Sequence, residues 1–178
     1  SHALFLGNSL PVREVDFYGS GNGSEVKLGL NRGASGIDGL VASSAGYSKG
    51  LKQPLTLLLG DLSLLHDLNS LKLISESPKP IVLIVLNNHG GGIFSFLPIS
   101  EHKDIFETYF STPHSLEFKD AAKMFKLPYF HPESPEEFES IYLKQTSADK
   151  SCIIEVNTLK EDNIRVQKEW TEFLHQNR

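Results

Sequence analysis

The sequence lacks the features that mark disulfide-rich, membrane-spanning or nucleic-acid-binding proteins. It has one cysteine, Cys152, which excludes an internal disulfide framework and a cysteine-based zinc site. Its longest apolar run, Pro80–Leu86, is far shorter than the ~20 residues of a membrane-spanning helix, and it has no signal-peptide pattern. The 17 Lys and Arg against 22 Asp and Glu give a net charge of −5 with no basic cluster, which argues against nucleic acid as the main partner.

What is present is an ordinary globular composition. Of the 178 residues, 39% are hydrophobic and 22% are charged, which is enough to bury a proper core. Domains typically contain about 100–150 residues, and the chain has no internal repeat, linker or low-complexity tract, so we predict a single domain over residues 1–178. The chain begins with Ser1-His2 instead of Met, which is compatible with a piece of a longer protein.

Two continuous apolar runs indicate buried parallel strands. Leu55–Leu59 and Ile81–Leu86 do not alternate with polar residues, as expected where both faces of a strand are covered. Between them Leu62–Ser77 is predicted to be a helix that Pro78 and Pro80 end. Its expected inner residues are Leu64, Leu65, Leu68, Leu71 and Ile74. We therefore predict a strand–helix–strand unit with a right-handed crossover.

The same alternation recurs along the rest of the chain. We predict further strands at Ala3–Leu6, Val26–Leu30, Tyr129–His131 and Ser151–Val156. Further helices are predicted at Ile37–Lys49, Ser115–Phe125, from Ser134 onward, and at Asn163–His175. We expect the following side chains to face the core: Leu116, Ala121, Met124, Phe125, Trp170 and Phe173. About six strands alternating with helices indicate an α/β three-layer sandwich with a mainly parallel sheet.

Polar residues follow the two buried strands, at the edge where open parallel sheets bind ligands. Asp61 follows the first strand and Asn88 follows the second. If the strands are neighbours, their carboxyl ends lie about 5 Å apart, and the two side-chain oxygens could share one cation. Such hard ligands favour Mg²⁺ or Ca²⁺ over zinc. An isolated Asp at such a place is about as often an ordinary helix cap.

Three consecutive glycines, Gly90–Gly92, come directly after this Asn and the histidine that follows it. Asn and Gly are normal loop residues, but three glycines in a row are entropically costly unless the backbone must approach something closely. They would leave backbone groups free to contact a metal and a phosphate. The combination of carboxylate, amide and glycines therefore predicts a metal–phosphate site.

These motifs resemble those of a known enzyme superfamily. Gly60-Asp61 and the later Asn87-Asn88 are similar to the metal–diphosphate signature of thiamine-diphosphate enzymes, except that Leu62 occupies the place of its usual final Gly. Four segments narrow the family: Gly7–Ser9, Asn31–Gly39, Gly60–Ser63 and Gly91–Phe94. They resemble the 2-succinyl-5-enolpyruvyl-6-hydroxy-3-cyclohexene-1-carboxylate synthase family, whose own signature carries Leu after Gly-Asp. The resemblance covers nearly the whole chain, but only the carboxyl-terminal, diphosphate-binding third of the family's protein.

The resemblance implies a site for thiamine diphosphate with Mg²⁺ or Mn²⁺. The metal would be held by Asp61, Asn88 and the backbone oxygen of Gly90, while His89 is not assigned as a ligand. Ile37 corresponds to the aliphatic residue that holds the cofactor in a V shape, so that its own aminopyrimidine removes the thiazolium proton. On the residues alone, Ile37 is an ordinary core residue. The implied cofactor-binding residues are Gly36, Ile37, Gly60, Asp61, Leu62, Ser63, Asn88, Gly90, Gly91, Ile93 and Phe94.

The resemblance also implies a substrate site. Ser9, Arg13 and Arg32 correspond to residues that bind a succinyl carboxylate, to which the planar fork of Arg donates two parallel hydrogen bonds. These three residues and the cofactor-supporting isoleucine make up the implied catalytic set. A second group corresponds to an apolar wall over the substrate: Ile93, Phe94 and Leu97. On the residues alone, Arg13 also fits a solvated helix face, and Leu97 fits core packing.

The implied reaction is decarboxylation of 2-oxoglutarate and 1,4-addition to isochorismate, in menaquinone and phylloquinone biosynthesis. In this superfamily a Glu on an amino-terminal pyrimidine-binding domain activates the cofactor, usually across a subunit interface. That domain and the central domain are absent from this chain, so we expect the isolated chain to be inactive. The intact protein is expected to be a homo-oligomer, a dimer or tetramer, in the cytoplasm if bacterial and in the plastid if from a plant or alga.

Other interpretations stay open. The chain could be a non-catalytic module that binds thiamine diphosphate and Mg²⁺, a domain of another thiamine-diphosphate-dependent 2-oxo acid enzyme, or, more distantly, a nicotinamide-dependent oxidoreductase. Gly19–Gly23 is weak support for the last, because a strand-like segment follows it, and we interpret it as a surface turn. The histidines, His89 and His114 among them, show no zinc-motif spacing and are interpreted as solvated or capping. Cys152 is expected to be buried and inert.

Overall fold

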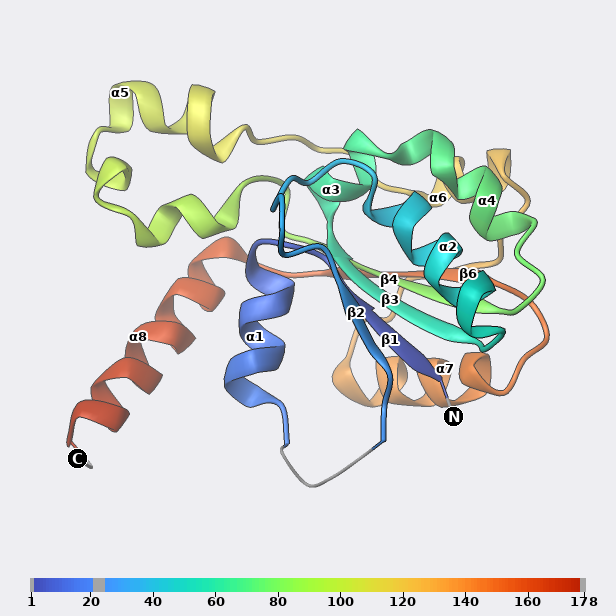
Figure 1. Cartoon of the computed structure of the whole chain (residues 1–178). Helices are drawn as coiled ribbons and strands as arrows, with labels where there is room; N and C mark the ends of the chain where they lie inside the picture. Colours follow the sequence, from blue (N-terminus) through green and yellow to red (C-terminus); the bar gives the residue numbers. More distant parts are fainter. Residues whose placement is uncertain (1, 21–24, 177–178) are drawn as a thin grey trace.

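The computed structural model describes residues 2–20 and 25–176, in which six strands form one sheet (Figure 1). The strands are β1 (Ala3–Leu6), β2 (Leu28–Leu30), β3 (Leu55–Gly60), β4 (Ile81–Asn87), β5 (Tyr129–Phe130) and β6 (Cys152–Asn157). Their order across the sheet is β2-β1-β3-β4-β6-β5, and every neighbouring pair is parallel. The predicted α/β class and parallel sheet are confirmed. The interpretation of Gly19–Gly23 falls largely outside the described residues.

Helices cover both faces of the sheet and make the predicted three layers (Figure 1). One face carries α2 (Leu40–Leu51), α3 (Asp61–His66), α4 (Leu71–Ser75) and α6 (Lys119–Met124). The other carries α1 (Leu10–Tyr18) and α7 (Pro135–Thr146), whose cap is the predicted Ser134. The last helix, α8 (Lys160–Gln176), runs beside α1, and α5 (Lys103–Phe106) lies among short helical turns beyond the carboxyl ends of the strands. No described helix is long and apolar enough to cross a membrane.

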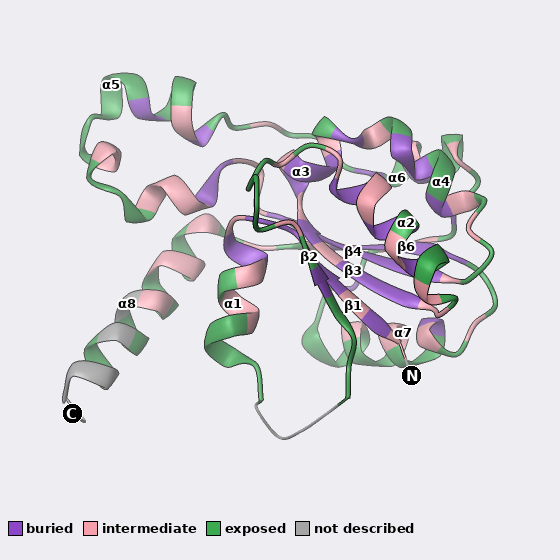
Figure 2. Cartoon of the chain, viewed as in Figure 1, coloured by how far each residue is buried: buried purple, intermediate pink, exposed green. Residues whose placement is uncertain are grey.

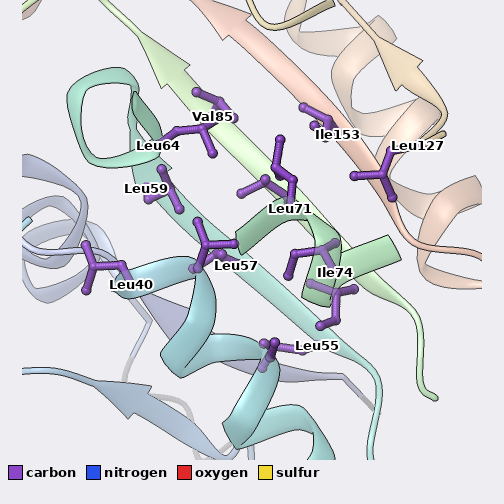
Figure 3. Close-up of a cluster of buried hydrophobic side chains, with 14 of the residues drawn as sticks. Leu40, Leu55, Leu57, Leu59, Leu64, Leu71, Ile74, Val85, Leu127 and Ile153 are labelled. Atoms are coloured by element: carbon purple, nitrogen blue, oxygen red, sulfur yellow. The ribbon is translucent and has the colours of Figure 1, made fainter. Parts of the chain in front are cut away.

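The core follows from the two-residue period of the strands. In β3, Leu57 and Leu59 are fully buried in the larger cluster, beneath α2 and α4 (Figure 3). Their neighbour Leu58 points to the opposite face, where it packs in a smaller cluster with Val82 and Ile84 of β4. Both faces of the central strands are therefore covered, which is why their sequences are continuous apolar runs.

The predicted helix over Leu62–Ser77 is wrong as a single element. It is broken into α3, a 3₁₀ turn at Leu68–Ser70, and α4. The break lies at Asp67, whose buried carboxylate accepts hydrogen bonds from the backbone N–H of Ala42 (2.9 Å) and from Ser70 Oγ (2.5 Å). Hydrogen bonds from such a side chain to nearby and distant groups compete with the backbone hydrogen bonds that would continue the helix. The predicted inner residues are nevertheless buried or packed against the core.

Several predicted inner residues are exposed. Leu116 precedes the helix it was assigned to, because α6 begins only at Lys119, and Met124 of α6 is 77% exposed. Trp170 and Phe173 lie on α8 but do not reach the core, and Trp170 packs edge-on against the Tyr18 ring of α1. Figure 2 shows that the described part of α8 is mostly exposed or half-buried. Helical spacing predicts that these side chains share one side of a helix, but it does not predict whether the core packs against that side.

Candidate functional site

A cleft of about 850 Å³ opens at the carboxyl ends of the strands. The condition set for the site is met, because β3 and β4 are neighbours whose last paired residues are Gly60 and Leu86. Asp61 and Asn88, which follow these ends, both line the cleft. The two polar segments are thus brought to one edge of the sheet, where parallel strands are expected to present their ligands.

Asp61 is the buried charged group at the centre of this edge, with 2% exposure. Its Oδ1 accepts a hydrogen bond from the backbone N–H of Leu62 (2.7 Å), and its Oδ2 accepts one from the N–H of Gly90 (2.9 Å). Burial raises the pKa of this carboxyl above its ordinary value, although the two backbone N–H groups and His114 act in the opposite direction. The carboxylate keeps a lone pair on each oxygen that these backbone bonds do not use.

The turn after β4 that contains Gly90–Gly92, here called the glycine turn, is shaped by close contacts that exclude side chains. Gly90 has φ +148°, and a Cβ there would lie closer than 3.0 Å to the backbone oxygen of Ser111. Gly91 donates its N–H to that same oxygen at 2.7 Å. Gly92 lies against the Asn88 amide, where a Cβ would again be too close. The glycines that the sequence singled out are therefore required by close backbone approach, as predicted.

A histidine that sequence reasoning set aside lies in the same cluster. The His114 side chain is only 11% exposed, and its Nε2 lies 3.2 Å from Asp61 Oδ2. Its Nδ1 accepts a hydrogen bond from the N–H of Leu116 (3.2 Å), so in the neutral ring Nε2 carries the proton and faces the carboxylate. Of the two interpretations given for the histidines, solvated or capping, the first is wrong for His114, while its bond to the Leu116 N–H fits the second. No spacing motif could reveal it, since the histidine reaches the site from a separate segment of the chain.

Within residues 2–20 and 25–176, no group of three or more His, Cys, Asp or Glu side chains could hold a metal ion. A cation beside Asp61 would therefore need the Asn88 amide, backbone oxygens and oxygens of a bound ligand. Mg²⁺ is commonly bound in this way, with one or two carboxylates and the remaining positions filled by phosphate and water. The donor set fits a hard cation that arrives with a phosphorylated ligand.

The second side of the cleft is formed where β1 leads into α1. Arg32 Nη1 donates to Asn8 Oδ1 (3.1 Å), and Asn8 Nδ2 donates to the backbone oxygen of Gly36 (2.7 Å). Through these two bonds Asn8, which is 2% exposed, links the Arg32 loop to the segment after β1. The sequence did not indicate this role. Arg13 Nη1 donates to the backbone oxygen of Ser9 (2.7 Å), which has a positive φ of 74° just before α1.

Most of the predicted site residues line this cleft, and two do not. Those that line it are Ser9, Arg13, Arg32, Ile37, Gly60, Asp61, Leu62, Ser63, Asn88, Gly90, Gly91, Ile93 and Phe94. Ile37 is half-buried in the loop before α2, not at the helix start that was predicted. Gly36 contacts the site through Asn8, and Leu97 lines a smaller adjoining cavity of about 370 Å³.

Residues at the start of α8 also line the cleft, and the sequence did not indicate them. The lining includes Leu159, Asp162, Asn163 and Val166. They follow β6, which pairs with β4 and therefore ends at the same edge of the sheet. As residues that follow a parallel strand, they obey the same topological rule as Asp61. They give the cleft an acidic and apolar wall in addition to the glycine turn.

Comparison with known proteins finds relatives that are about half identical to this chain. No protein-family model matches the chain. The 2-succinyl-5-enolpyruvyl-6-hydroxy-3-cyclohexene-1-carboxylate synthase of Chlorobium phaeobacteroides strain BS1 is 49% identical over 166 residues, which are 92% of this chain. The same enzyme of Chlorobium phaeovibrioides strain DSM 265 is 49% identical over 168 residues, or 94% of this chain. This chain is a homologue of that synthase.

The homology extends over only part of the synthase, because the chain spans 29% of the length of both relatives. Among solved structures, benzoylformate decarboxylase from Polynucleobacter necessarius has a TM-score of 0.75. Its sequence is 15% identical, and the match covers 90% of this chain and 30% of the decarboxylase. At that identity the likeness shows a shared fold. The cleft and its glycine turn therefore lie within a fold that also occurs in that decarboxylase.

Proposed function

We propose that this chain is the diphosphate-binding domain of a 2-succinyl-5-enolpyruvyl-6-hydroxy-3-cyclohexene-1-carboxylate synthase and that it binds thiamine diphosphate with Mg²⁺ or Mn²⁺. The observation that carries the proposal is the convergence of Asp61 and the Asn88–Gly90 turn in a homologue of that synthase. In the proposal, Asp61 Oδ1 or Oδ2, the Asn88 amide oxygen and the Gly90 carbonyl hold the metal. The diphosphate oxygens complete the coordination.

The residues of the glycine turn and α3 would hold the rest of the cofactor. The turn lets its backbone approach a diphosphate because no Cβ intervenes at Gly90 or Gly91. Ile37 borders the cleft, where it would support the two rings. When bound, thiamine diphosphate supplies a nucleophilic carbon and an electron sink for the decarboxylation of a 2-oxo acid. The contribution of the protein is to hold the metal, orient the rings and exclude water.

Charged and apolar side chains of the cleft support the substrate assignment. We propose that Arg32, with Ser9 and Arg13, binds carboxylates of 2-oxoglutarate and isochorismate, because guanidinium groups match carboxylates with paired hydrogen bonds. Asn8 restrains the Arg32 guanidinium and so lowers the entropy lost when a carboxylate binds. Ile93, Phe94 and Leu97 would cover the apolar part of the substrate. This reaction would place the protein in menaquinone or phylloquinone biosynthesis.

The cofactor proposal is tested by calorimetric titration of the chain with thiamine diphosphate, with and without Mg²⁺. We expect binding that requires Mg²⁺ and that disappears in Asp61→Ala, because this change removes the only charged protein ligand of the proposed set. Asp67→Ala is the matched control: it removes another buried carboxylate with two hydrogen bonds, but one that does not line the cleft. Equal Mg²⁺-dependent binding by Asp61→Ala and the unsubstituted chain would refute the proposal.

The substrate proposal is tested by Arg32→Ala in the intact synthase. We expect unchanged cofactor affinity and a raised KM for 2-oxoglutarate, whereas Lys72→Ala, which removes an exposed cation outside the cleft, should change neither. A normal KM in Arg32→Ala would exclude this residue from carboxylate binding and leave the cofactor proposal standing. In that case a cofactor-binding module becomes the better description.

The chain by itself is proposed to be inactive. It spans 29% of the relatives' length, and the group that activates the pyrimidine is proposed to come from a pyrimidine-binding domain of the same or another subunit in a homo-oligomer. The purified 178-residue chain should therefore bind the cofactor but form no product from 2-oxoglutarate and isochorismate. Measurable turnover by this chain alone would show that its own residues are sufficient.

A further inference from the structure

Glu155 is a fully buried carboxylate in the middle of β6, with no role in the proposed function. Its Oε1 accepts a hydrogen bond from Asn87 Nδ2 at 2.6 Å. Its Oε2 accepts bonds from the backbone N–H of Phe118 (2.9 Å) and the hydroxyl of Tyr129 (2.8 Å). Among the described residues it has no Lys, Arg or His partner within ion-pair distance. Because burying a carboxylate is costly, this residue needs an explanation.

Asn87, at the end of β4, is also fully buried and uses its whole amide group. Its Nδ2 donates to Glu155 and to the backbone oxygen of Leu116 (3.0 Å). Its Oδ1 accepts from the backbone N–H of His89 at 3.1 Å. A carboxylate can only accept hydrogen bonds, so Glu155 requires the NH₂ side of the Asn87 amide to face it. The amide oxygen is thereby directed to the turn.

The turn that donates this hydrogen bond has an unusual backbone. His89 has a positive φ of 58°, a conformation that is costly for a residue other than glycine, and Gly90 follows with φ +148°. Asn88 lies inside the turn, and the N–H of Gly90 reaches Asp61. Something must hold the turn in this shape, and the bond from His89 to the Asn87 oxygen does so at its first residue.

We propose that Glu155 is a positioning residue: by fixing the orientation of the Asn87 amide, it holds the His89–Gly90 turn in the shape that presents Asn88 and Gly90 to the cation. This inference rests on the proposed function, since it concerns the metal at the same site. Glu155 itself does not line the cleft, so it acts only through Asn87 and the turn. Sequence reasoning passed over it, although a charged residue within an apolar strand is a signal.

The test is the Mg²⁺ dependence of thiamine diphosphate binding by the purified chain, measured by calorimetry at several Mg²⁺ concentrations. In Glu155→Gln the side chain has one acceptor oxygen. If that oxygen faces Phe118 and Tyr129, its NH₂ faces the Asn87 NH₂, and the Asn87 amide must turn over. The His89 N–H then loses its acceptor. We expect the apparent Mg²⁺ dissociation constant to rise about tenfold, as for the loss of one buried hydrogen bond.

Tyr129→Phe is the matched control, because it removes a different donor to the same carboxylate and leaves Asn87 untouched. It should lower the melting temperature without changing the Mg²⁺ dependence. The rescue variant combines Glu155→Gln with Asn87→Asp. In this pair the amide NH₂ introduced on β6 can donate to one oxygen of the carboxylate introduced on β4. The other oxygen of that carboxylate accepts from the His89 N–H, but the Leu116 carbonyl loses the donor that Asn87 gave it. Part of the Mg²⁺ affinity should therefore return.

The results distinguish this inference from the proposed function. If the unsubstituted chain shows no Mg²⁺-dependent binding, the proposed function fails. If it binds, but Glu155→Gln retains its Mg²⁺ dependence or the rescue variant is no better than Glu155→Gln, the positioning role is refuted. Should Glu155→Gln fail to fold, Asn87→Ala removes the same acceptor from His89 and is expected to give the same tenfold loss. An unchanged Mg²⁺ dependence in Asn87→Ala would overturn the inference equally.

Discussion

Gly90→Ala should destabilise the fold, because two costs meet at this position. The first is conformational: an alanine at φ +148° costs about 1–3 kcal/mol. The second is steric, since the new Cβ would lie closer than 3.0 Å to the Ser111 backbone oxygen. That oxygen already accepts the N–H of Gly91 at 2.7 Å, so relieving the contact breaks a hydrogen bond that contributes about 1 kcal/mol.

Together these terms give a loss of about 2–4 kcal/mol in the free energy of unfolding. For a chain of this size 1 kcal/mol shifts the melting temperature by about 2–4 °C, so we expect a decrease of about 5–15 °C. Thermal unfolding followed by far-ultraviolet circular dichroism measures it. The same variant should lose Mg²⁺-dependent cofactor binding, because the turn must move away from Ser111.

The matched control is the same substitution at Gly46, an exposed position inside α2 where a Cβ meets no atom within 4 Å. Alanine is favoured over glycine in a helix interior by about 1 kcal/mol, so Gly46→Ala should raise the melting temperature by about 2–4 °C. The reasoning is refuted if Gly90→Ala unfolds at the temperature of the unsubstituted chain, or if the two variants shift it in the same direction.

Two further predictions concern the core, and a third concerns an exposed side chain as their control. Burial raises the pKa of the Cys152 thiol to about 12, so the unfolded chain ionises first as the pH rises above about 8.5. Stability should then fall with pH by up to about 1.4 kcal/mol per unit, more steeply than in Cys152→Ala, and iodoacetamide should label the thiol only in urea. Leu57→Ala, at a fully buried site, should cost about 2–5 kcal/mol in urea unfolding. Met124→Ala, at a side chain 77% exposed, should change stability by less than about 0.5 kcal/mol.

The central strands could be predicted closely because their signal is local. β1 has the predicted bounds, and β3 and β4 differ from prediction by one residue each, since a run of apolar residues buried on both faces has few alternatives. The long helix between β3 and β4 could not be predicted as broken, because its break depends on the contact between Asp67 and Ala42, 25 positions earlier. Such a contact exists only once the sheet and α2 have assembled.

Two regions give little periodic signal and are not among the predicted helices, although Arg13 fits a solvated helix face. In α1 only Leu10 and Pro11 are buried, so a helical stripe is hardly visible in its sequence. Residues 92–111 form α5 with short 3₁₀ and π turns, whose periods differ from the 3.6 residues on which the prediction depends. Both regions contribute residues to the lining of the cleft.

The residues of the candidate site also fall into a predictable group and an unpredictable group. Asp61, Asn88 and the glycines follow strands closely, and the topology of a parallel sheet alone predicts that such residues meet. Asn8, His114 and Glu155 support them from segments that are distant in sequence, and each contact depends on tertiary packing. Residues that follow strands can therefore be found by a rule of topology, whereas the side chains that orient them require the structure.

The arrangement of these supports explains why the glycine turn is stable without a regular element of its own. Hydrogen bonds hold it from three directions: the Asp61 carboxylate at Gly90, the Ser111 oxygen at Gly91, and the Asn87 amide at His89. Each support comes from a different segment, so losing any one leaves two that restrain the turn in an altered shape. Substitutions of the supporting side chains should therefore change metal affinity more than they change the fold, and this separation makes the site measurable apart from stability.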